Sequence, residues 1–143
     1  MKVRDILHAK GRQVYTVSPD ETVHDVVRVL MAHRIGALLV VDGDGLTRGI
    51  ITERDVLREC LDGADRLDQV QVRHAMTTDL VVGLLDDDLD CTMSAMTQHR
   101  IRHLPIMDGG AVAGLISIGD LVKASLDETA YENGFLREYI QGR

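Results

Sequence analysis

A hydroxyl residue followed three positions later by an acid occurs twice in this chain, each time after a short apolar run that begins with glycine. The first copy is Gly49-Ile50-Ile51-Thr52 with Asp55, and the second is Gly114-Leu115-Ile116-Ser117 with Asp120. A hydroxyl and free N–H groups at the start of a helix suit a phosphate, and a carboxylate can accept both hydrogen bonds of a ribose diol. Glycine would let the backbone pass close to such a ligand. Each copy could therefore hold a ribose and its phosphate.

The same residues also have a purely structural interpretation. Thr or Ser followed three residues later by an acid is a capping box, in which the two side chains satisfy backbone N–H groups at a helix start. Viewed alone, either copy fits a cap and a ligand site about equally well.

The two copies belong to an internal duplication. His33-Arg34-Ile35 recurs as His99-Arg100-Ile101, an offset of 66 (99 − 33), and the glycines of the two motifs are 65 residues apart (114 − 49). A third echo, Val3-Arg4-Asp5-Ile6-Leu7, returns as Val72-Arg73-His74-Ala75-Met76. Two units indicate a pseudo-two-fold protein rather than a solenoid, which needs at least three repeats. Any binding site should therefore exist in two related copies.

Each repeat predicts the order helix, strand, strand, helix. In repeat one, an amphipathic helix follows the start signal Ser18-Pro19-Asp20, and its predicted buried stripe comprises Val23, Val26, Val27, Leu30 and Met31. Strands are predicted at 37–41 and 49–51 around a turn at 42–45, and a helix follows Thr52 and stops at Asp62-Gly63. It carries Val56, Leu57 and Leu61.

Repeat two has the same pattern, with strands predicted at 104–107 and 112–116. Its helices carry Leu89, Met93 and Met96, then Leu121 and Val122. We predict an α/β (α+β) fold of two pseudo-symmetric repeats, each a small mixed β-sheet flanked by helices, packed sheet to sheet. The expected boundaries are 1–66 for repeat one, 67–126 for repeat two and 127–143 for a C-terminal helix.

Composition excludes several classes of function. The formal charge of −7 opposes general nucleic-acid binding, and four aromatic residues without Trp oppose a base-stacking platform. No apolar run approaches the ~18–20 residues of a membrane span, and no signal-peptide core follows Met1. We therefore expect a cytoplasmic protein without membrane contact. Cys60 and Cys91 are expected to be small core residues.

Catalytic and metal chemistry also find little support. The acidic run Asp86-Asp87-Asp88 precedes a predicted helix, where carboxylates favour the helix dipole, and no EF-hand spacing is present. His33 and His99 end predicted helices and have no Ser or Cys partner in the pattern. We expect no metal site and no enzyme.

From about Val3 to Leu126 the chain resembles a tandem pair of CBS domains, the Bateman module of cystathionine β-synthase that is also found in IMP dehydrogenases and chloride channels. The two glycine-led motifs carry the resemblance, together with His103-Leu104-Pro105-Ile106-Met107-Asp108. In that family the central cleft of the pair holds adenosine ligands such as AMP, ADP, ATP or S-adenosylmethionine. The resemblance implies a sensor with no catalytic residue, no catalytic cofactor and no metal, whose regulatory ligand is one of these or NAD.

The resemblance also implies a role for each matching residue. Asp55 and Asp120 would hold ribose hydroxyls. The phosphate would be contacted by Thr52, Ser117, Arg102, His103, Arg54 and Arg100. The adenine cleft would be formed beside Val14, Thr16, Val17, Ala37, Leu38, Leu39, Leu104, Pro105 and Ile116.

The two repeats depart from one another at the cleft wall. Repeat one has Gly36-Ala37 where repeat two has Arg102-His103, and Leu39 where repeat two has Pro105. The wall of repeat one is therefore less basic. We expect two sites of unequal affinity, with the tighter site beside Arg102 and His103.

The C-terminal segment predicts a further surface. Tyr131, Phe135 and Tyr139 recur at helical spacing beside Leu136 and Ile140, so they would line one stripe. The stripe would pack on its own repeat or on a partner subunit, and pairs resembling this one commonly form flat dimeric discs. The leading hypothesis is a stand-alone homodimeric sensor of adenine nucleotides that allosterically signals energy state to a separate protein. The alternative is a constitutive dimeric scaffold without ligand.

Overall fold

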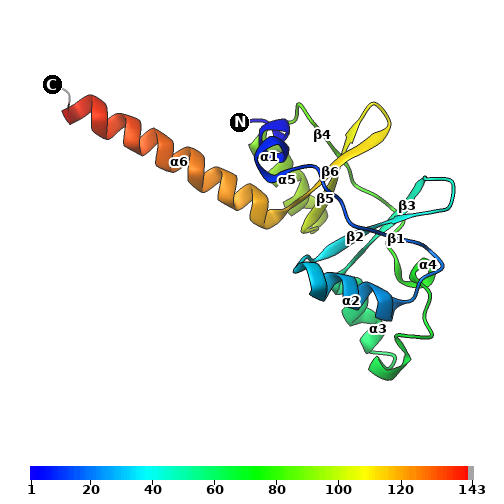
Figure 1. Cartoon of the computed structure of the whole chain (residues 1–143). Coiled ribbons are helices and arrows are strands. Elements are labelled where there is room, and N and C mark those ends of the chain that lie inside the picture. The colour runs from blue at the N-terminus through cyan, green and yellow to red at the C-terminus, as the bar shows by residue number, and fades with distance from the viewer. Residues whose placement is uncertain (142–143) are drawn as a thin grey trace. The chain divides into compact units, whose positions relative to one another are not determined.

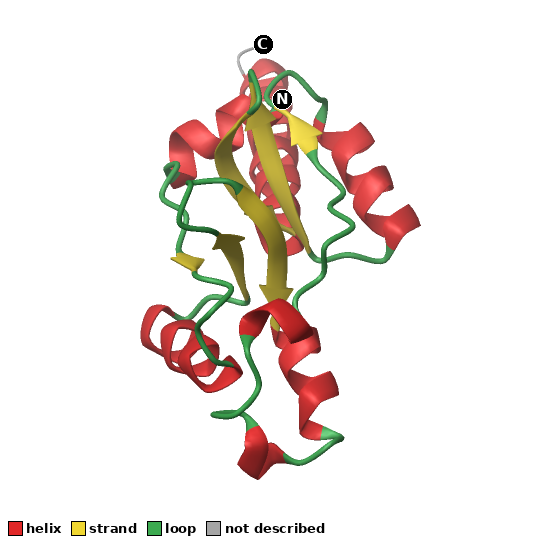
Figure 2. Ribbon diagram, turned by 90° about the vertical axis from the view of Figure 1, so that its right-hand side faces the viewer, coloured by secondary structure: helices red, strands yellow, loops and turns green. Residues whose placement is uncertain are grey.

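In the computed structural model, which describes residues 1–141, the chain forms two compact units (Figure 1). The first-sheet unit comprises Val14–Leu80, and the second-sheet unit comprises Met1–Gln13 together with the chain from Val81 onward. Each unit is built on its own three-stranded mixed sheet (Figure 2). This confirms the predicted fold class of two small mixed sheets flanked by helices.

In the first-sheet unit, β1 (Thr16–Val17) runs parallel to β2 (Ala37–Val41), and β2 pairs antiparallel with β3 (Thr47–Thr52). Its helices are α2 (Val23–His33), α3 (Glu53–Cys60) and α4 (Val72–Ala75), with a short 3₁₀ helix at Ala64–Arg66. One apolar cluster joins the sheet to these helices and includes Val23, Val26, Leu38, Ile51 and Val72, all fully buried.

The second-sheet unit repeats this topology. β4 (Gly83–Leu84) runs parallel to β5 (His103–Asp108), and β5 pairs antiparallel with β6 (Ala111–Ser117). Its helices are α1 (Val3–Lys10), α5 (Leu89–His99) and α6 (Ile118–Gln141). Its apolar cluster includes Leu7, Met96, Leu104, Ile116 and Leu121, which are at most 1% exposed.

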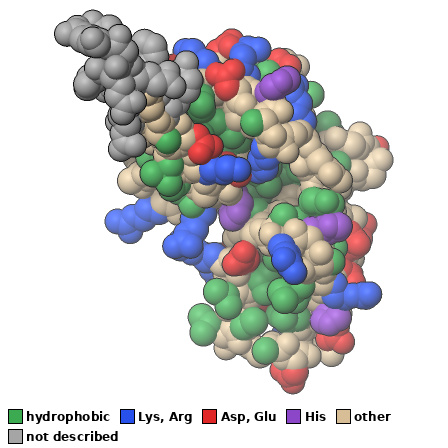
Figure 3. Space-filling model, turned by 60° about the vertical axis from the view of Figure 1, so that its left-hand side comes forward, with side chains coloured by type: hydrophobic (Ala, Val, Ile, Leu, Met, Phe, Trp, Pro, Cys, Tyr) green, Lys and Arg blue, Asp and Glu red, His purple; other side chains and the backbone are tan. Residues whose placement is uncertain are grey.

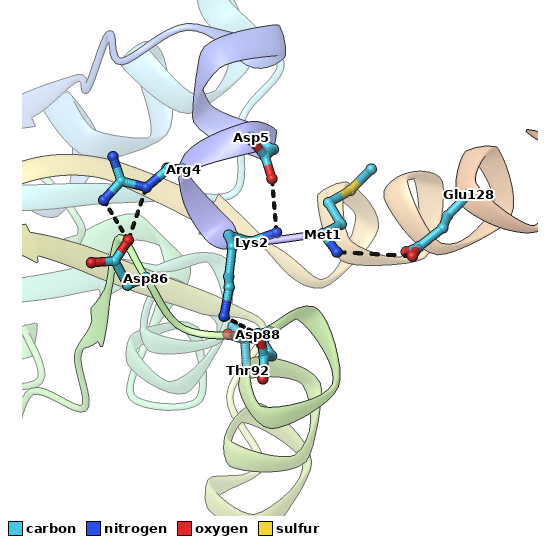
Figure 4. A network of polar contacts seen from close by, with 8 residues as sticks. All are labelled: Met1, Lys2, Arg4, Asp5, Asp86, Asp88, Thr92 and Glu128. Atoms are coloured by element: carbon cyan, nitrogen blue, oxygen red, sulfur yellow. Dashed lines mark hydrogen bonds and ion pairs between the residues drawn. The ribbon is translucent and has the colours of Figure 1, made fainter.

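The leading segments of the two repeats are exchanged between the units. The sequence echo aligns α1 with α4, yet α1 packs with the sheet of repeat two, and α4 with the sheet of repeat one. Three ion pairs fasten the N-terminal segment: Lys2 to Asp88 at 2.6 Å, Arg4 to Asp86, and the Met1 amino group to Glu128 at 3.8 Å (Figure 4). The boundaries at 66/67 and 126/127 divide the sequence into its two repeats and the C-terminal helix, and they stay predictions.

Several sequence expectations can be compared with the structure directly. The helices end at His33 and His99 as predicted. The predicted burial of Met31 is wrong: its side chain is 75% exposed, because it lies at the edge of the stripe centred on Val26 and Leu30. Cys91 is exposed rather than in the core, since it lies about half a turn around α5 from the buried Leu89. Cys60 is half-buried.

Two further expectations concern the ends of the chain and the membrane. Within residues 1–141 no helix is both long and apolar enough to cross a bilayer. The side chains of the predicted aromatic stripe, Tyr131, Phe135 and Tyr139, lie outside those that the structure describes.

Candidate functional site

In the first motif, hydrogen-bond donors from the chain itself contact both carboxylate oxygens of Asp55. Thr52 ends β3 and Asp55 lies in the first turn of α3, where the Thr52 N–H donates to Asp55 Oδ2 at 3.0 Å and the Asp55 N–H donates to Thr52 Oγ1 at 3.3 Å. Arg58 Nη1 and Thr77 Oγ1 each donate to Oδ1 at 3.2 Å. The Asp55 side chain is only 4% exposed. Both of its carboxylate oxygens therefore have partners within this unit.

The second motif has the same cap but a different additional partner. The Ser117 N–H donates to Asp120 Oδ2 at 2.9 Å, and the Asp120 N–H donates to Ser117 Oγ at 3.1 Å. Lys10 Nζ, at the end of α1, lies 2.5 Å from the same Oδ2 and also donates to the Leu115 carbonyl at 2.7 Å. The Asp120 side chain is 25% exposed. This carboxylate is more accessible than that of Asp55.

The charge state of Asp120 follows from these contacts. Burial acts to raise the pKa of its carboxyl, but the hydrogen bonds from Lys10 and Ser117 and the charge of Lys10 outweigh burial. The net effect lowers the pKa below its ordinary value. Asp120 is therefore ionised at neutral pH and can act purely as an acceptor.

The basic residues predicted for repeat two lie beside its motif. His103 is the register partner of Ser117 across β5 and β6, and the Arg102 carbonyl accepts a hydrogen bond from the Ile118 N–H at 2.8 Å. In the first-sheet unit the corresponding positions are Ala37, opposite Thr52, and Gly36, whose carbonyl accepts from Glu53 at 3.0 Å. The tertiary structure thus brings two basic residues to the second motif and none to the matching positions of the first.

The other two predicted phosphate residues occupy helix ends. Arg54 is the second residue of α3, and Arg100 follows the last residue of α5 in a left-handed backbone conformation, φ 54°. Both side chains are exposed.

The residues predicted around adenine fall into two sets. The side chains of Val17, Leu38, Leu104 and Ile116 belong to the apolar clusters of their units, so any contact that these positions make with a base would come from their backbone. Leu39 and Pro105 lie on the opposite faces of their strands, because side chains alternate along a strand. Ala37 is buried, Val14 is half-buried and Thr16 is exposed.

The motif glycines are required by the chain itself. A Cβ at Gly49 would lie 2.6 Å from the Thr77 carbonyl oxygen, and a Cβ at Gly114 would lie 2.6 Å from Leu7 Cδ2. We expected these glycines to admit a ligand. The structure instead places the exchanged leading segments against them.

Two residues of the site were absent from the sequence prediction. Thr77 reaches Asp55 from 22 residues away, and Lys10 reaches Asp120 from 110 residues away. No helix or strand periodicity links such positions. They become neighbours only because α1 and the segment after α4 pack in the exchanged units.

A separate cavity of about 520 Å³ lies in the first-sheet unit. Two ion pairs flank it, Arg48 with Asp42 at 2.5 Å and Arg73 with Asp20. Its remaining lining residues are Ser18, Pro19, Gly43, Met76 and Thr78, so it does not include the first motif. Across the described residues, no group of three or more His, Cys, Asp or Glu side chains could hold a metal ion.

The structure defines a protein of two repeated sheet units, each with a capped strand-to-helix motif, and sequence comparison identifies its family. The CBS domain family matches this chain twice, at residues 3–62 and 72–127. The chain belongs to the CBS domain family, which confirms the resemblance noted from the motifs.

Individual relatives agree with this assignment. The CBS domain-containing protein YhcV of Bacillus subtilis is 38% identical over 110 residues, 76% of either chain. The crystal structure of the CBS-domain protein ATU1752 from Agrobacterium tumefaciens is 42% identical, with a TM-score of 0.85 over 87% of this chain and 99% of that one. The CBS domain pair of protein MJ0100, solved in complex with 5-methylthioadenosine and S-adenosyl-L-methionine, is 22% identical, with a TM-score of 0.76 over 90% and 98% of the two chains.

Proposed function

We propose that this chain is a non-catalytic regulatory module that binds an adenosine-type ligand at its second motif and transmits occupancy to a separate protein. The observation that carries the proposal is the Asp120 carboxylate. It is ionised and one-quarter exposed, and it lies at a helix start beside Ser117. A ribose diol needs such an acceptor, and a helix N-terminus favours the phosphate that would follow it.

The adenosine part of the proposal is supported by family membership and by one solved relative. The CBS domain pair of protein MJ0100 holds two adenosine-containing ligands. AMP, ADP, ATP, NAD and S-adenosylmethionine share this adenosine group, so all of them are candidates for this chain. The proposal includes cytoplasmic location and excludes membrane and nucleic-acid partners.

The two motifs are proposed to differ in affinity. Asp55 is 4% exposed and receives donors on both oxygens, whereas Asp120 is 25% exposed. Arg102 adds a positive charge and His103 adds an imidazole beside the second motif, where the first repeat has Gly36 and Ala37. A ribose at Asp55 would have to displace both Arg58 and Thr77 from a buried carboxylate, whereas at Asp120 it would displace only Lys10 from a more exposed one, so the second motif is proposed as the tighter site.

A thermal-shift panel of the five candidate ligands tests the proposal. Ligand at ~100 times its dissociation constant should add ~2.7 kcal/mol to the unfolding free energy. Asp120→Ala should abolish the shift while the protein stays folded without ligand. Asp88→Ala is the matched control, because Asp88 also lies at a helix start and pairs with a lysine, Lys2, which precedes α1. No shift of the natural sequence with any ligand would refute the proposal.

The alternative function is a constitutive scaffold without ligand. It is favoured by the reciprocal Thr52–Asp55 and Ser117–Asp120 hydrogen bonds, which are complete capping boxes. A scaffold would give no shift with any ligand of the panel, whereas loss of the helix cap in Asp120→Ala costs about 1 kcal/mol under either function. The same experiment therefore separates the two functions.

Homodimer formation is the second part of the proposal. Leu57 and Leu61 are 66% and 87% exposed in the first-sheet unit. Their repeat counterparts Val122 and Leu126, 65 positions later (122 − 57 and 126 − 61), are 46% and 65% exposed. Figure 3 shows apolar side chains gathered on the face of the first-sheet unit that carries its helices. A repeated apolar surface suits a closed two-fold assembly.

Sedimentation velocity tests this assembly. Leu57→Glu combined with Leu61→Glu should convert the dimer to a monomer. Leu46→Glu changes an equally apolar residue that is 54% exposed in the β2–β3 turn, and should leave the dimer intact. A second test removes the residues after Asp127, where an unchanged oligomer size would eliminate an interface role for the C-terminal segment.

A further inference from the structure

Lys10 occupies the carboxylate that the proposed function assigns to ribose. Its ammonium lies 2.5 Å from Asp120 Oδ2 and 2.7 Å from the Leu115 carbonyl oxygen, so it ties the last residue of α1 to β6 and to the first turn of α6. The Lys10 side chain is 38% exposed, and an exposed ion pair of this kind is weak. The contact is therefore one that a ligand can break.

A ribose diol and Lys10 compete for the same oxygens. A diol donates one hydrogen bond to each oxygen of a carboxylate, whereas Oδ2 of Asp120 already accepts from Ser117 and Lys10. A third donor at Oδ2 exceeds the two lone pairs of that oxygen. Entry of the diol consequently requires Lys10 to leave.

We propose that Lys10 is a displaceable counter-ion, which holds the second site closed and releases the end of α1 when a ligand diol takes Asp120. This inference rests on the proposed function, since it requires Asp120 to receive ribose. In the first repeat the cation on Asp55 is Arg58 of α3 itself, and the exchanged segment contributes only the neutral Thr77 hydroxyl. The device belongs to one motif of the pair.

Displacement of Lys10 acts at a junction in the chain. Lys10 is the last residue of α1, and the chain passes from the second-sheet unit to the first-sheet unit between Gln13 and Val14. Gly11, whose N–H donates to the Leu7 carbonyl at 2.7 Å, closes the helix with φ +98°. Loss of the Lys10 contact releases the end of α1 from β6 and α6. Ligand binding at the second motif therefore changes the anchoring of the segment that joins the two units.

The first test measures adenosine affinity by calorimetry. Adenosine is uncharged, so loss of the lysine charge does not act through a phosphate. Lys10→Met keeps the apolar stem and removes the competitor, and should tighten adenosine binding by about two- to five-fold, the range typical of an exposed ion pair. The gain should vanish with 2′-deoxyadenosine, which lacks the diol. Unchanged or weaker adenosine binding by the variant overturns the proposal.

Lys2→Met is the matched control. Lys2 lies at the other end of α1 and makes an ion pair of similar length with Asp88 (Figure 4). The Lys2→Met substitution therefore removes the same charge without changing a contact of Asp120. Adenosine affinity should stay at the value of the natural sequence. An equal gain in both variants would assign the effect to net charge and would overturn the role of Lys10.

A second test uses the natural sequence, so it checks the proposal even if the Lys10→Met variant does not fold. Hydrogen exchange of the last amides of α1 and of Gly11 should become faster when AMP is bound, because Lys10 no longer anchors that turn. Slower or unchanged exchange overturns the proposal. If the natural sequence binds neither adenosine nor AMP, the proposed function fails and the inference fails with it, whereas binding without faster exchange refutes the inference alone.

Discussion

Leu7 of α1 packs onto Gly114 of β6 so closely that a Cβ at position 114 would lie 2.6 Å from Leu7 Cδ2. Met76 stands in the same relation to Gly49, with its sulfur 3.1 Å from the corresponding Cβ position. Leu7 and Met76 are equivalent in the sequence echo, as are Gly49 and Gly114. In each unit, therefore, the exchanged leading segment rests on the glycine that opens the motif.

Gly114→Ala should lower the free energy of unfolding by about 1–3 kcal/mol, because the added methyl group overpacks a site where Leu7 is fully buried. Leu7→Ala in the same chain should make the glycine substitution harmless, and urea denaturation of the four variants of this cycle measures the coupling. Gly43→Ala, where no atom lies within 4 Å, should change stability by less than ~0.5 kcal/mol. Additive effects of the Leu7 and Gly114 substitutions would contradict the contact.

Asp55→Ala should destabilise the protein more than Asp120→Ala. Removing Asp55 removes the helix cap together with the hydrogen bonds that Thr77 and Arg58 donate to a buried carboxylate, which we expect to cost about 2–3 kcal/mol in all. Removing Asp120 costs mainly a helix cap, about 1 kcal/mol. Urea denaturation without ligand compares the two, and equal losses would show that the closed environment of Asp55 contributes nothing.

Arg34→Gly and Arg100→Gly should each raise stability by up to about 1 kcal/mol. Both arginines follow a helix with left-handed backbone angles, φ 53° and 54°, which strain a residue with a Cβ but not glycine. Thermal unfolding measures the gain, with Arg12→Gly as a control at an exposed loop position. A loss of stability in either variant would show that the arginine side chain compensates for the strain.

Stability should fall in acid in part through Asp25. The hydrogen bonds from the Thr22 N–H and hydroxyl lower the pKa of the Asp25 carboxyl below its ordinary value of 3.8. Because the folded pKa lies below the unfolded pKa, this contribution is complete above the ordinary value and is lost as pH falls through the folded pKa.

Urea denaturation at steps from pH ~5 downward should therefore show a steeper decline for the natural sequence than for Asp25→Asn. Thr22→Ala should also flatten the decline, since it removes one of the two donors. Parallel curves for all three proteins would refute this origin of the acid sensitivity.

Much of the fold is determined locally. The stripe of Val23, Val26 and Leu30 specifies a helix, and the apolar run before the turn Asp42-Gly43-Asp44-Gly45 specifies a hairpin, because side-chain periodicity follows from backbone geometry. Met31 marks the limit of this reasoning. A periodic pattern gives the axis of a buried stripe, but the width of that stripe depends on what packs against it.

The candidate site likewise has one part that the sequence predicts and another that only the tertiary structure shows. Thr52 with Asp55 and Ser117 with Asp120 are recognisable because three-residue spacing at a helix start has a local physical cause. Their difference in accessibility is not visible in the spacing, since it depends on Thr77, Arg58 and Lys10. A cap and a ligand site look identical in sequence until the remaining donors around each carboxylate are known.

By itself, the sequence determined the duplication, the order of elements, the two acidic motifs and the family to which the chain belongs. Only the tertiary structure decided that α1 and α4 exchange units, and hence that Lys10 meets Asp120 while Thr77 meets Asp55. The reason is physical: periodicity encodes which face of a segment is buried, but it does not encode which of two similar apolar surfaces covers that face.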